Sequence, residues 1–261
     1  MSITLKHIPE RTVRPRNHGL TMVMDKGLSI NQVQDMLNTC HPYIDMVKLG
    51  FGTAYVTPNL DEKLSFYKSN GIAVYFGGTL FEAFVYRGQF DDYVKAIEKY
   101  KMQYVEVSDG SIDMEHDEKL EYIRKLSKYA TVISEVGSKD NSHIIPPYVW
   151  LRMMKAELEA GAWKVIAEAR ESGTSGIYMG SGEARDGLVE EILSEVKPED
   201  VIWEAPLKIQ QEYFINKLGC NVNLGNIAPN DVIPLETLRL GLRSDTFYNF
   251  LPEELQRKKK K

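Results

Sequence analysis

Cysteine is nearly absent from this sequence, which has only Cys40 and Cys220 among its 261 residues. Two cysteines are too few for a disulfide framework and fit a reducing environment, so we interpret both as thiols of the core. No stretch approaches the roughly 20 apolar residues that cross a bilayer, and residues 1–20 hold no apolar signal segment. We therefore expect a cytoplasmic protein that does not act on membranes.

An excess of basic charge is also missing, since 37 acidic residues outnumber 32 basic ones and the net charge is -5. This balance offers no general surface for nucleic acid. The lysines at residues 258–261 are the exception, and we interpret them as a solvated chain end. The five histidines show no H-x-x-x-H spacing and no C-x-x-C pair occurs, so a zinc site is not indicated.

Short apolar runs rich in β-forming residues alternate with segments of helical periodicity along the whole chain. This alternation predicts a parallel sheet. The predicted strands cover residues 20–24, 44–49, 72–76, 104–107, 132–136, 163–167, 201–203 and 220–224. Between the first two, Ile30, Val33, Met36, Leu37 and Cys40 form one apolar stripe of a helix. Similar stripes occur within residues 90–100, 120–126, 189–196 and 235–242.

The eight repeated units favour a closed (β/α)8 barrel over an open doubly wound sheet. The length is close to the ~250 residues of such a barrel, and no G-x-G-x-x-G motif follows the first strand. We predict one barrel domain over residues 1–261, with an N-terminal extension over about 1–17 and a basic tail over about 252–261. Residues 173–187, rich in glycine and serine, are predicted as a mobile loop on the active face, with an ordinary surface insertion as the alternative.

Polar residues follow the predicted strands at their carboxyl ends, where barrels of this kind build active sites. Some lie inside apolar runs, as Lys48 does in DMVKLG and Glu135 does in VISEVG. A buried charge must be paired, bind an ion or meet a ligand, because leaving it alone costs several kcal/mol. Mutual pairing inside the barrel remains an alternative for each residue, whereas the convergence of so many predicts a functional site.

Carboxylates at these positions suggest Mg²⁺, which prefers oxygen ligands. The candidate ligands are Glu106, Glu135, Glu168 and Glu204, with Asp25 and Asp109 as weaker candidates. The bases and the glycine-containing turns after the strands would hold an anionic substrate such as a phosphate. The candidates for that role are Lys48, Arg170, Gly78 and Asn226. Barrels often bind phosphate after strands seven and eight, which here means the region of residues 204–208 and 225–226.

The ordered segments MDKGLS, DMVKLGFGT, YFGGTLFE, VEVSDGS, SEVGSKD, EARESG, WEAPLK, NVNLGNIAP and LETLRLGLRSDTF resemble the phosphosulfolactate synthase family. They lie within residues 21–247, which are nearly the whole chain. The resemblance implies a (β/α)8 barrel that requires Mg²⁺ and adds sulfite to phosphoenolpyruvate, giving (2R)-2-phospho-3-sulfolactate. It also implies a homo-oligomer, a trimer, and leaves open whether the product feeds coenzyme M synthesis or sulfolactate formation.

The resemblance assigns the proton donor of this reaction to Lys139, in SEVGSKD. Attack of sulfite on the methylene carbon produces an enediolate, whose second carbon must receive a proton from a positioned general acid. Lys48, Arg170 and the loop around Asn226 are assigned to phosphate, carboxylate or sulfite, with partners that are interchangeable on the sequence alone. Arg239, in the stretch that makes the last helix, is given a structural role, as is Arg243.

Two other functions are compatible with these patterns. The first is a barrel lyase or aldolase acting on a small phosphorylated acid, with Lys48 or Lys139 as a Schiff-base amine. The second is a non-catalytic role, because a plant heat-stress protein family with chaperone-like activity resembles the same barrel. Charged residues retained at the strand ends argue against a purely structural protein.

Overall fold

A computed structural model describes residues 3–137 and 145–256 of the chain. In these residues, eight parallel strands form one sheet in the order β3-β2-β1-β8-β7-β6-β5-β4, and β3 contacts β4. The sheet therefore closes on itself, and the predicted (β/α)8 barrel is confirmed. The strands are β1 Thr21–Asp25, β2 Met46–Leu49, β3 Ala73–Phe76, β4 Tyr104–Val107, β5 Thr131–Val136, β6 Lys164–Ala167, β7 Val201–Glu204 and β8 Leu224–Ile227.

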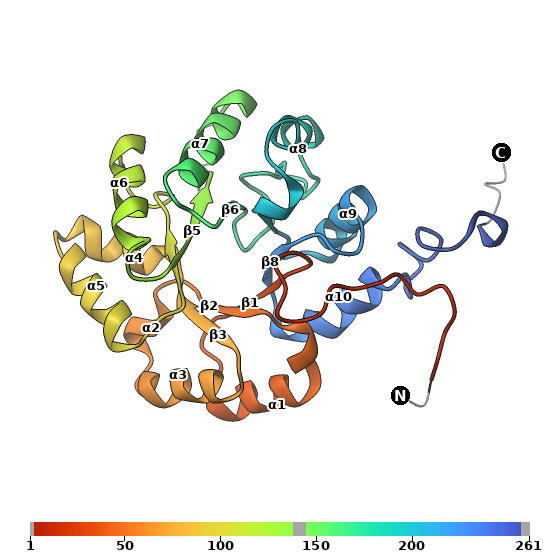
Figure 1. The fold of residues 1–261 in the computed structure, drawn as a ribbon, viewed down its shortest axis with the longest axis horizontal. Coiled ribbons are helices and arrows are strands. Elements are labelled where there is room, and N and C mark those ends of the chain that lie inside the picture. Colours follow the sequence, from red (N-terminus) through yellow and green to blue (C-terminus); the bar gives the residue numbers. More distant parts are fainter. Residues whose placement is uncertain (1–2, 138–144, 257–261) are drawn as a thin grey trace.

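Helices surround the strands on the outside of the barrel (Figure 1). They are α1 Ile30–Cys40, α2 Thr53–Val56, α3 Leu60–Ser69, α4 Gly78–Tyr86, α5 Phe90–Lys99, α6 His116–Leu126, α7 Pro147–Glu159, α8 Asp186–Leu193, α9 Lys208–Leu218 and α10 Val232–Arg239. Helix α1 begins after Ser29, which forms a capping box with Gln32. The predicted stripe of α1 is buried at its last four positions. None of the helices in the described part of the chain is both long and apolar enough to span a bilayer.

Two apolar layers hold the barrel together, because side chains alternate between the two faces of each strand. The larger layer, which includes Val23, Val47 and Val105, lies between the strands and the helices. A smaller cluster fills the barrel interior with Leu20, Met22, Met46, Tyr75, Ile133, Ile166 and Ile202. In several strands the next inward-facing residue lies two positions further along. These residues form a second layer above the interior cluster.

Seven of the eight predicted strands match the observed ones closely, and the last overlaps β8 only at Leu224. Residues 220–224 were predicted, but β8 begins only at Leu224. The segment before it is a turn, which the Asn223 side chain fixes by accepting from the Leu20 amide and donating to the Val201 carbonyl. Gly225 stands inside β8 because a Cβ there would lie 2.6 Å from Met22 Cε. Glycine and asparagine are poor strand formers, so the sequence pattern favoured a strand before residue 225.

Residues 173–187 pack against the start of α9, and the mobility that we expected of this loop stays a prediction. The Gln210 amide group donates to the carbonyls of Gly173 at 2.7 Å and Gly182 at 3.1 Å. The Tyr178 hydroxyl is buried and donates to the Glu204 carbonyl at 2.6 Å. These bonds tie the segment to the end of β7 and to the start of α9.

The amino ends of the strands are closed by the N-terminal extension and α10. Arg16 forms an ion pair with Asp45 at 2.8 Å, and Asp45 in turn accepts from the Thr21 amide. Arg239 is fully buried and donates to the carbonyls of Leu20, Cys220 and Val222. These contacts agree with the structural role predicted for Arg239.

Candidate active site

The carboxyl-end layer of the barrel is polar because of strand alternation. Five strands carry an inward apolar residue followed two positions later by a charged one, and side chains two positions apart share a face. The charged residues are Lys48 on β2, Glu106 on β4, Glu135 on β5, Glu204 on β7 and Glu168 directly after β6. All five are buried. The predicted convergence of charge at the strand ends is therefore present in the structure.

Lys48 lies at the centre of this layer. Its ammonium is 2.8 Å from Glu106 Oε1, 3.2 Å from Glu135 Oε2 and 3.5 Å from Glu204 Oε1. Burial by itself lowers the pKa of Lys48, but the three carboxylates outweigh it and raise the pKa well above its usual value. The side chain is consequently held as a cation, which makes it a poor Schiff-base nucleophile.

Glu106 is tied to the start of α4. Its Oε1 accepts from the Gly78 amide at 2.6 Å, and its Oε2 accepts from the Tyr75 hydroxyl at 3.3 Å. A Cβ at Gly78 would lie 2.1 Å from Ser108 Oγ, so only glycine allows this approach of α4 to β4. Burial raises the pKa of Glu106, and Lys48 opposes that rise.

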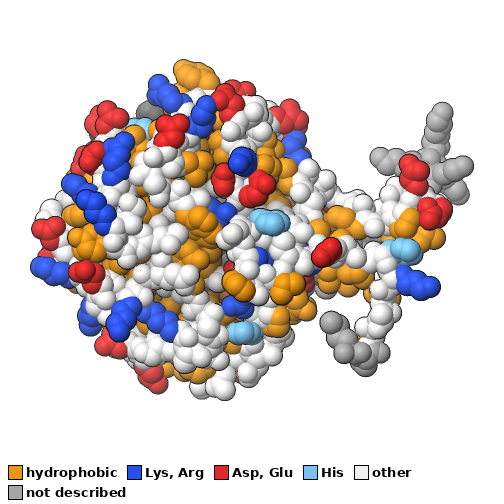
Figure 2. Space-filling view, in the orientation of Figure 1, with side chains coloured by type: hydrophobic (Ala, Val, Ile, Leu, Met, Phe, Trp, Pro, Cys, Tyr) orange, Lys and Arg blue, Asp and Glu red, His pale blue; other side chains and the backbone are white. Residues whose placement is uncertain are grey.

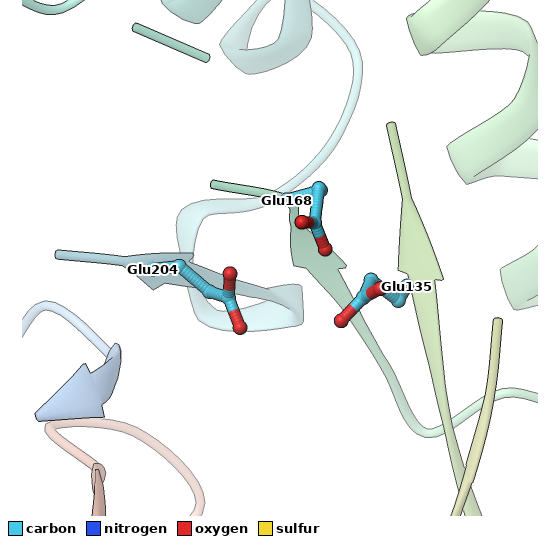
Figure 3. A group of neighbouring side chains, drawn as sticks. All are labelled: Glu135, Glu168 and Glu204. Atoms are coloured by element: carbon cyan, nitrogen blue, oxygen red, sulfur yellow. The ribbon is translucent and has the colours of Figure 1, made fainter. Parts of the chain in front are cut away.

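Three other carboxylates point toward one another from β5, β6 and β7 (Figure 3). Glu135, Glu168 and Glu204 each offer one oxygen, and these oxygens lie within 4.8 Å of one another. Burial raises the pKa of Glu204 to about 7, with Lys48 opposing the rise and Glu135 adding to it. Buried oxygen ligands crowded in this way fit a hard divalent cation such as Mg²⁺, which would relieve their mutual repulsion.

A cavity of about 610 Å³ opens above this layer. Eight of the residues predicted for the site line it, namely Lys48, Gly78, Glu106, Glu135, Glu168, Arg170, Glu204 and Asn226. Arg170 is exposed, so its guanidinium can meet an anion that enters from solvent. Asn226 is buried and has a positive φ of 56°, at the point inside β8 where the register with β1 shifts.

The two weaker metal candidates do not line the cavity, and each of them binds a buried lysine of a surrounding helix. Asp25 follows the inward-facing Met24 and is bound from outside by Lys63 at 2.7 Å and by the Tyr67 hydroxyl at 2.9 Å. Asp109, after β4, is 3.0 Å from Lys119. Strand parity thus separates Asp25 from the three clustered glutamates, and the contact with Lys119 holds Asp109 away from them.

Sequence reasoning missed several residues of the cavity wall, among them Met24, Phe51, Thr79, Ser111 and Ser172. The position of Met24 two residues after Met22 could have placed it, since both face inward. The other four lie at the start of a helix or in loops, where the sequence pattern does not indicate which way a side chain points. Lys208, in the region predicted to bind phosphate, is held instead in a contact with Asp245 at 2.5 Å.

Lys139, the predicted proton donor, lies outside the described residues. The chain enters that segment from β5, and Glu135 near the end of β5 lines the cavity. The assignment of the proton donor therefore stays a prediction.

Comparison with known proteins identifies the group to which this barrel belongs. The family model of (2R)-phospho-3-sulfolactate synthase (ComA) matches residues 9–245. The phosphosulfolactate synthase of Bacillus subtilis is 43% identical over 244 residues, which are 92% of this chain and 97% of the relative. That of Methanocaldococcus jannaschii is 43% identical over 235 residues, 88% of this chain and 94% of the relative.

The chain belongs to the phosphosulfolactate synthase family. Membership of this enzyme family confirms the prediction of an enzyme. Among solved structures, 3-hexulose-6-phosphate synthase from Salmonella typhimurium aligns with a TM-score of 0.57, at 11% identity, over 86% of this chain and all of that one. The 3-keto-L-gulonate-6-phosphate decarboxylase of Vibrio cholerae aligns with a TM-score of 0.52, at 10% identity, over 89% of this chain and 98% of that one. At such low identity the likeness to these two structures supports the fold of the chain alone.

Proposed function

We propose that this chain is a Mg²⁺-dependent phosphosulfolactate synthase, which adds sulfite to phosphoenolpyruvate to form (2R)-2-phospho-3-sulfolactate. The observation that carries the proposal is the cavity of a family member in which three clustered glutamates lie beside Lys48 and Arg170. This wall combines oxygen ligands for a divalent cation with cationic groups for an anion. Both substrates are anions, so the chemistry of the wall suits them.

In the proposed reaction the sulfur of sulfite attacks the methylene carbon of phosphoenolpyruvate. The electron pair of the double bond moves through the second carbon into the carboxylate and forms an enediolate. Held by Glu135, Glu168 and Glu204, Mg²⁺ would supply positive charge beside this developing negative charge. A proton then adds to the second carbon from one face, which completes the product without a covalent enzyme intermediate.

The chain's own residues would divide this work between them. Lys48 is a fixed cation in the floor of the cavity, where it can stabilise negative charge on the bound substrate. Arg170 at the exposed rim would bind phosphate or sulfite in a bidentate manner. Lys139, on the segment after β5, is our proposed general acid. Asn226 and the amino end of α4 at Gly78 complete the anion-binding wall.

The direct test mixes purified protein with phosphoenolpyruvate, sulfite and Mg²⁺ and follows the product by ³¹P nuclear magnetic resonance and mass spectrometry. We expect a sulfonated phosphate ester that forms only when all three are present. A parallel sample with a chelator separates the requirement for the metal. If no sulfonated product forms under any of these conditions, the proposed function is wrong.

The role of Lys139 makes a separate prediction. Lys139→Ala should lose at least about 100-fold in kcat, because positioned proton transfer contributes roughly 10²- to 10⁴-fold. Binding of phosphoenolpyruvate, measured by calorimetry, should change little, and circular dichroism should show a folded chain. Near-normal turnover in this variant would place the general acid at another residue.

Borohydride treatment in the presence of a carbonyl substrate discriminates the Schiff-base alternative, because a lysine forms an imine only with an aldehyde or ketone. Sodium borohydride should trap no covalent adduct on the wild-type chain, since Lys48 is locked as a cation by three carboxylates. A trapped adduct, mapped by peptide mass spectrometry to Lys48 or Lys139, would favour an aldolase instead.

A further inference from the structure

A second buried charge cluster lies behind the cavity wall, and Lys119 of α6 is at its centre. The side chain of Lys119 is fully buried. Its ammonium donates to Asp109 Oδ1 at 3.0 Å and to the backbone carbonyl of Glu135 at 2.5 Å. It also lies 3.0 Å from Glu157 Oε1. One ammonium thus joins α6, the loop after β4, the end of β5 and α7.

The groups that face this ammonium keep it charged. Glu157 is fully buried and also contacts His116 Nε2 at 3.2 Å. Burial lowers the pKa of Lys119, but Glu157 and Asp109 outweigh burial and raise it. Burial raises the pKa of Asp109, while Lys119 opposes that rise. The cluster is therefore an ion-pair network enclosed by α6 and α7.

Stability alone does not account for such a cluster. Removing two charges from water costs several kcal/mol per ion, and apolar side chains of similar volume are often as stable or more stable. What a hydrocarbon side chain cannot do is donate to a carbonyl and a carboxylate at fixed positions. The Lys119 bonds do this for two segments of the cavity wall.

Both segments carry cavity residues. Glu135, whose carbonyl accepts from Lys119, directs its carboxylate into the cavity toward Glu168 and Glu204. Asp109 is followed directly by Gly110 and Ser111, which line the same cavity. Lys119 itself is not part of the lining. Its effect on the site must therefore pass through these two neighbours.

We propose that Lys119 is a positioning residue, which holds the Glu135 carboxylate in register with Glu168 and Glu204 and fixes the Gly110–Ser111 wall for the anionic substrate. The proposal rests on the proposed function in two respects, the binding of a divalent cation by the three glutamates and the identity of the reaction. Groups that orient metal ligands from behind in this way commonly change metal affinity or activity by about 10- to 100-fold when they are removed.

The test uses the double variant K119M/E157M in the full chain. Replacing both fully buried charges by apolar groups of similar size avoids leaving Glu157 uncompensated. Among the described residues Asp109, whose side chain is 15% exposed, is the only carboxylate that loses its lysine, so the thermal midpoint should fall less than in Lys119→Met alone. Mn²⁺ affinity, measured by calorimetry and electron paramagnetic resonance, should fall by about 10- to 100-fold, and kcat should fall by a similar factor. A purely structural cluster predicts unchanged Mn²⁺ affinity and unchanged kcat, which would overturn the proposal.

Lys63→Met is the matched control. Lys63 is also a buried helical lysine that binds an aspartate near the carboxyl end of a strand, but its partner Asp25 is not part of the cavity lining. This variant should lower the thermal midpoint without changing Mn²⁺ affinity. Equal losses of affinity in both lysine variants would mean a general loss of order and would also overturn the proposal.

The two proposals fail in different ways. If wild-type protein makes no sulfonated product while Mn²⁺ affinity still falls in K119M/E157M, the proposed reaction is wrong and the positioning role stands. If wild-type protein makes the product and the double variant equals it in affinity and kcat, the reaction stands and the positioning role is wrong.

Discussion

The surroundings of Glu204 raise the pKa of its carboxyl group. Burial raises its pKa to about 7, from a usual value of 4.5. A carboxyl group whose pKa is raised by folding stabilises the folded state below its unfolded pKa, and that contribution is lost as pH rises through the folded pKa. The free energy of unfolding of the metal-free protein should therefore fall as the pH rises from about 4.5 to 7.

The comparison of wild-type protein with Glu204→Gln isolates this contribution. In the presence of a chelator, the free energy of unfolding of the wild type should fall relative to the variant between pH 4.5 and 8, by on the order of 3 kcal/mol. Urea unfolding across this range measures the difference. Glu62→Gln, on the exposed surface of α3, controls for the loss of any carboxylate. A difference that does not change with pH would contradict the shifted pKa of Glu204.

At the scale of single elements, the start of α4 depends on a glycine. Gly78→Ala would place a methyl group 2.1 Å from Ser108 Oγ. It would also disturb the hydrogen bond that the backbone amide of residue 78 donates to Glu106. Because neither β4 nor α4 can move away freely in a packed barrel, we expect a loss of about 1–3 kcal/mol in stability. Turnover should also fall, since Lys48 and Glu106 share this contact region.

The control for this prediction is Gly187→Ala in α8. A Cβ at Gly187 meets no atom within 4 Å, and its φ is not positive. Alanine favours the helix by about 1 kcal/mol, so this variant should be slightly more stable and fully active. Thermal unfolding and initial rates of the two variants check both expectations. Equal stability of the two variants would show that the space at Gly78 is not limiting.

On the scale of the whole molecule, the two ends of the barrel have different tasks. Figure 2 shows acidic and basic side chains interspersed around the rim of one face of the molecule. The carboxyl ends of the strands hold the cavity, whereas Arg239 and the N-terminal extension close the amino ends. In this fold the amino ends of the strands generally serve stability, whereas the carboxyl ends carry the active site.

Arg239→Leu tests this separation. The change removes the donor shared by three backbone carbonyls in the core, so stability should fall by on the order of 3 kcal/mol. Because the residue binds the opposite end of the barrel from the cavity, kcat of the folded variant should stay within about twofold. Denaturant unfolding and steady-state rates give the two quantities. A folded variant with strongly reduced kcat would contradict the division between the two ends.

Assembly is a further property of the whole molecule. We propose a homotrimer, as the family resemblance implies. Exposed apolar side chains such as Tyr55, Val56 and Tyr86 would gain from burial in an interface. Analytical ultracentrifugation should give three times the chain mass of 29.8 kDa. A species at the mass of one chain across the micromolar range would contradict the trimer.

The amino-acid sequence by itself determined the alternation of strands and helices, and hence the barrel, because the periods of 2 and 3.6 residues are local properties. It also determined that charge gathers at the strand ends, since Lys48 and Glu135 stand inside apolar runs. It placed β8 wrongly, because the strand needs Gly225 to pass Met22, and that neighbour comes from the other end of the chain. The prediction used the strand preferences of residues 220–224, whereas the position of β8 depends on its packing against β1.

Only the tertiary structure decided which charges meet. Asp25 and Glu204 look alike in sequence, each at the end of a strand, yet one faces a helix and the other the cavity. The role of Lys119 was also invisible, because its partners come from three separate elements. Contacts between residues far apart in the chain depend on closure of the barrel, which brings distant strand ends within a few ångströms of one another.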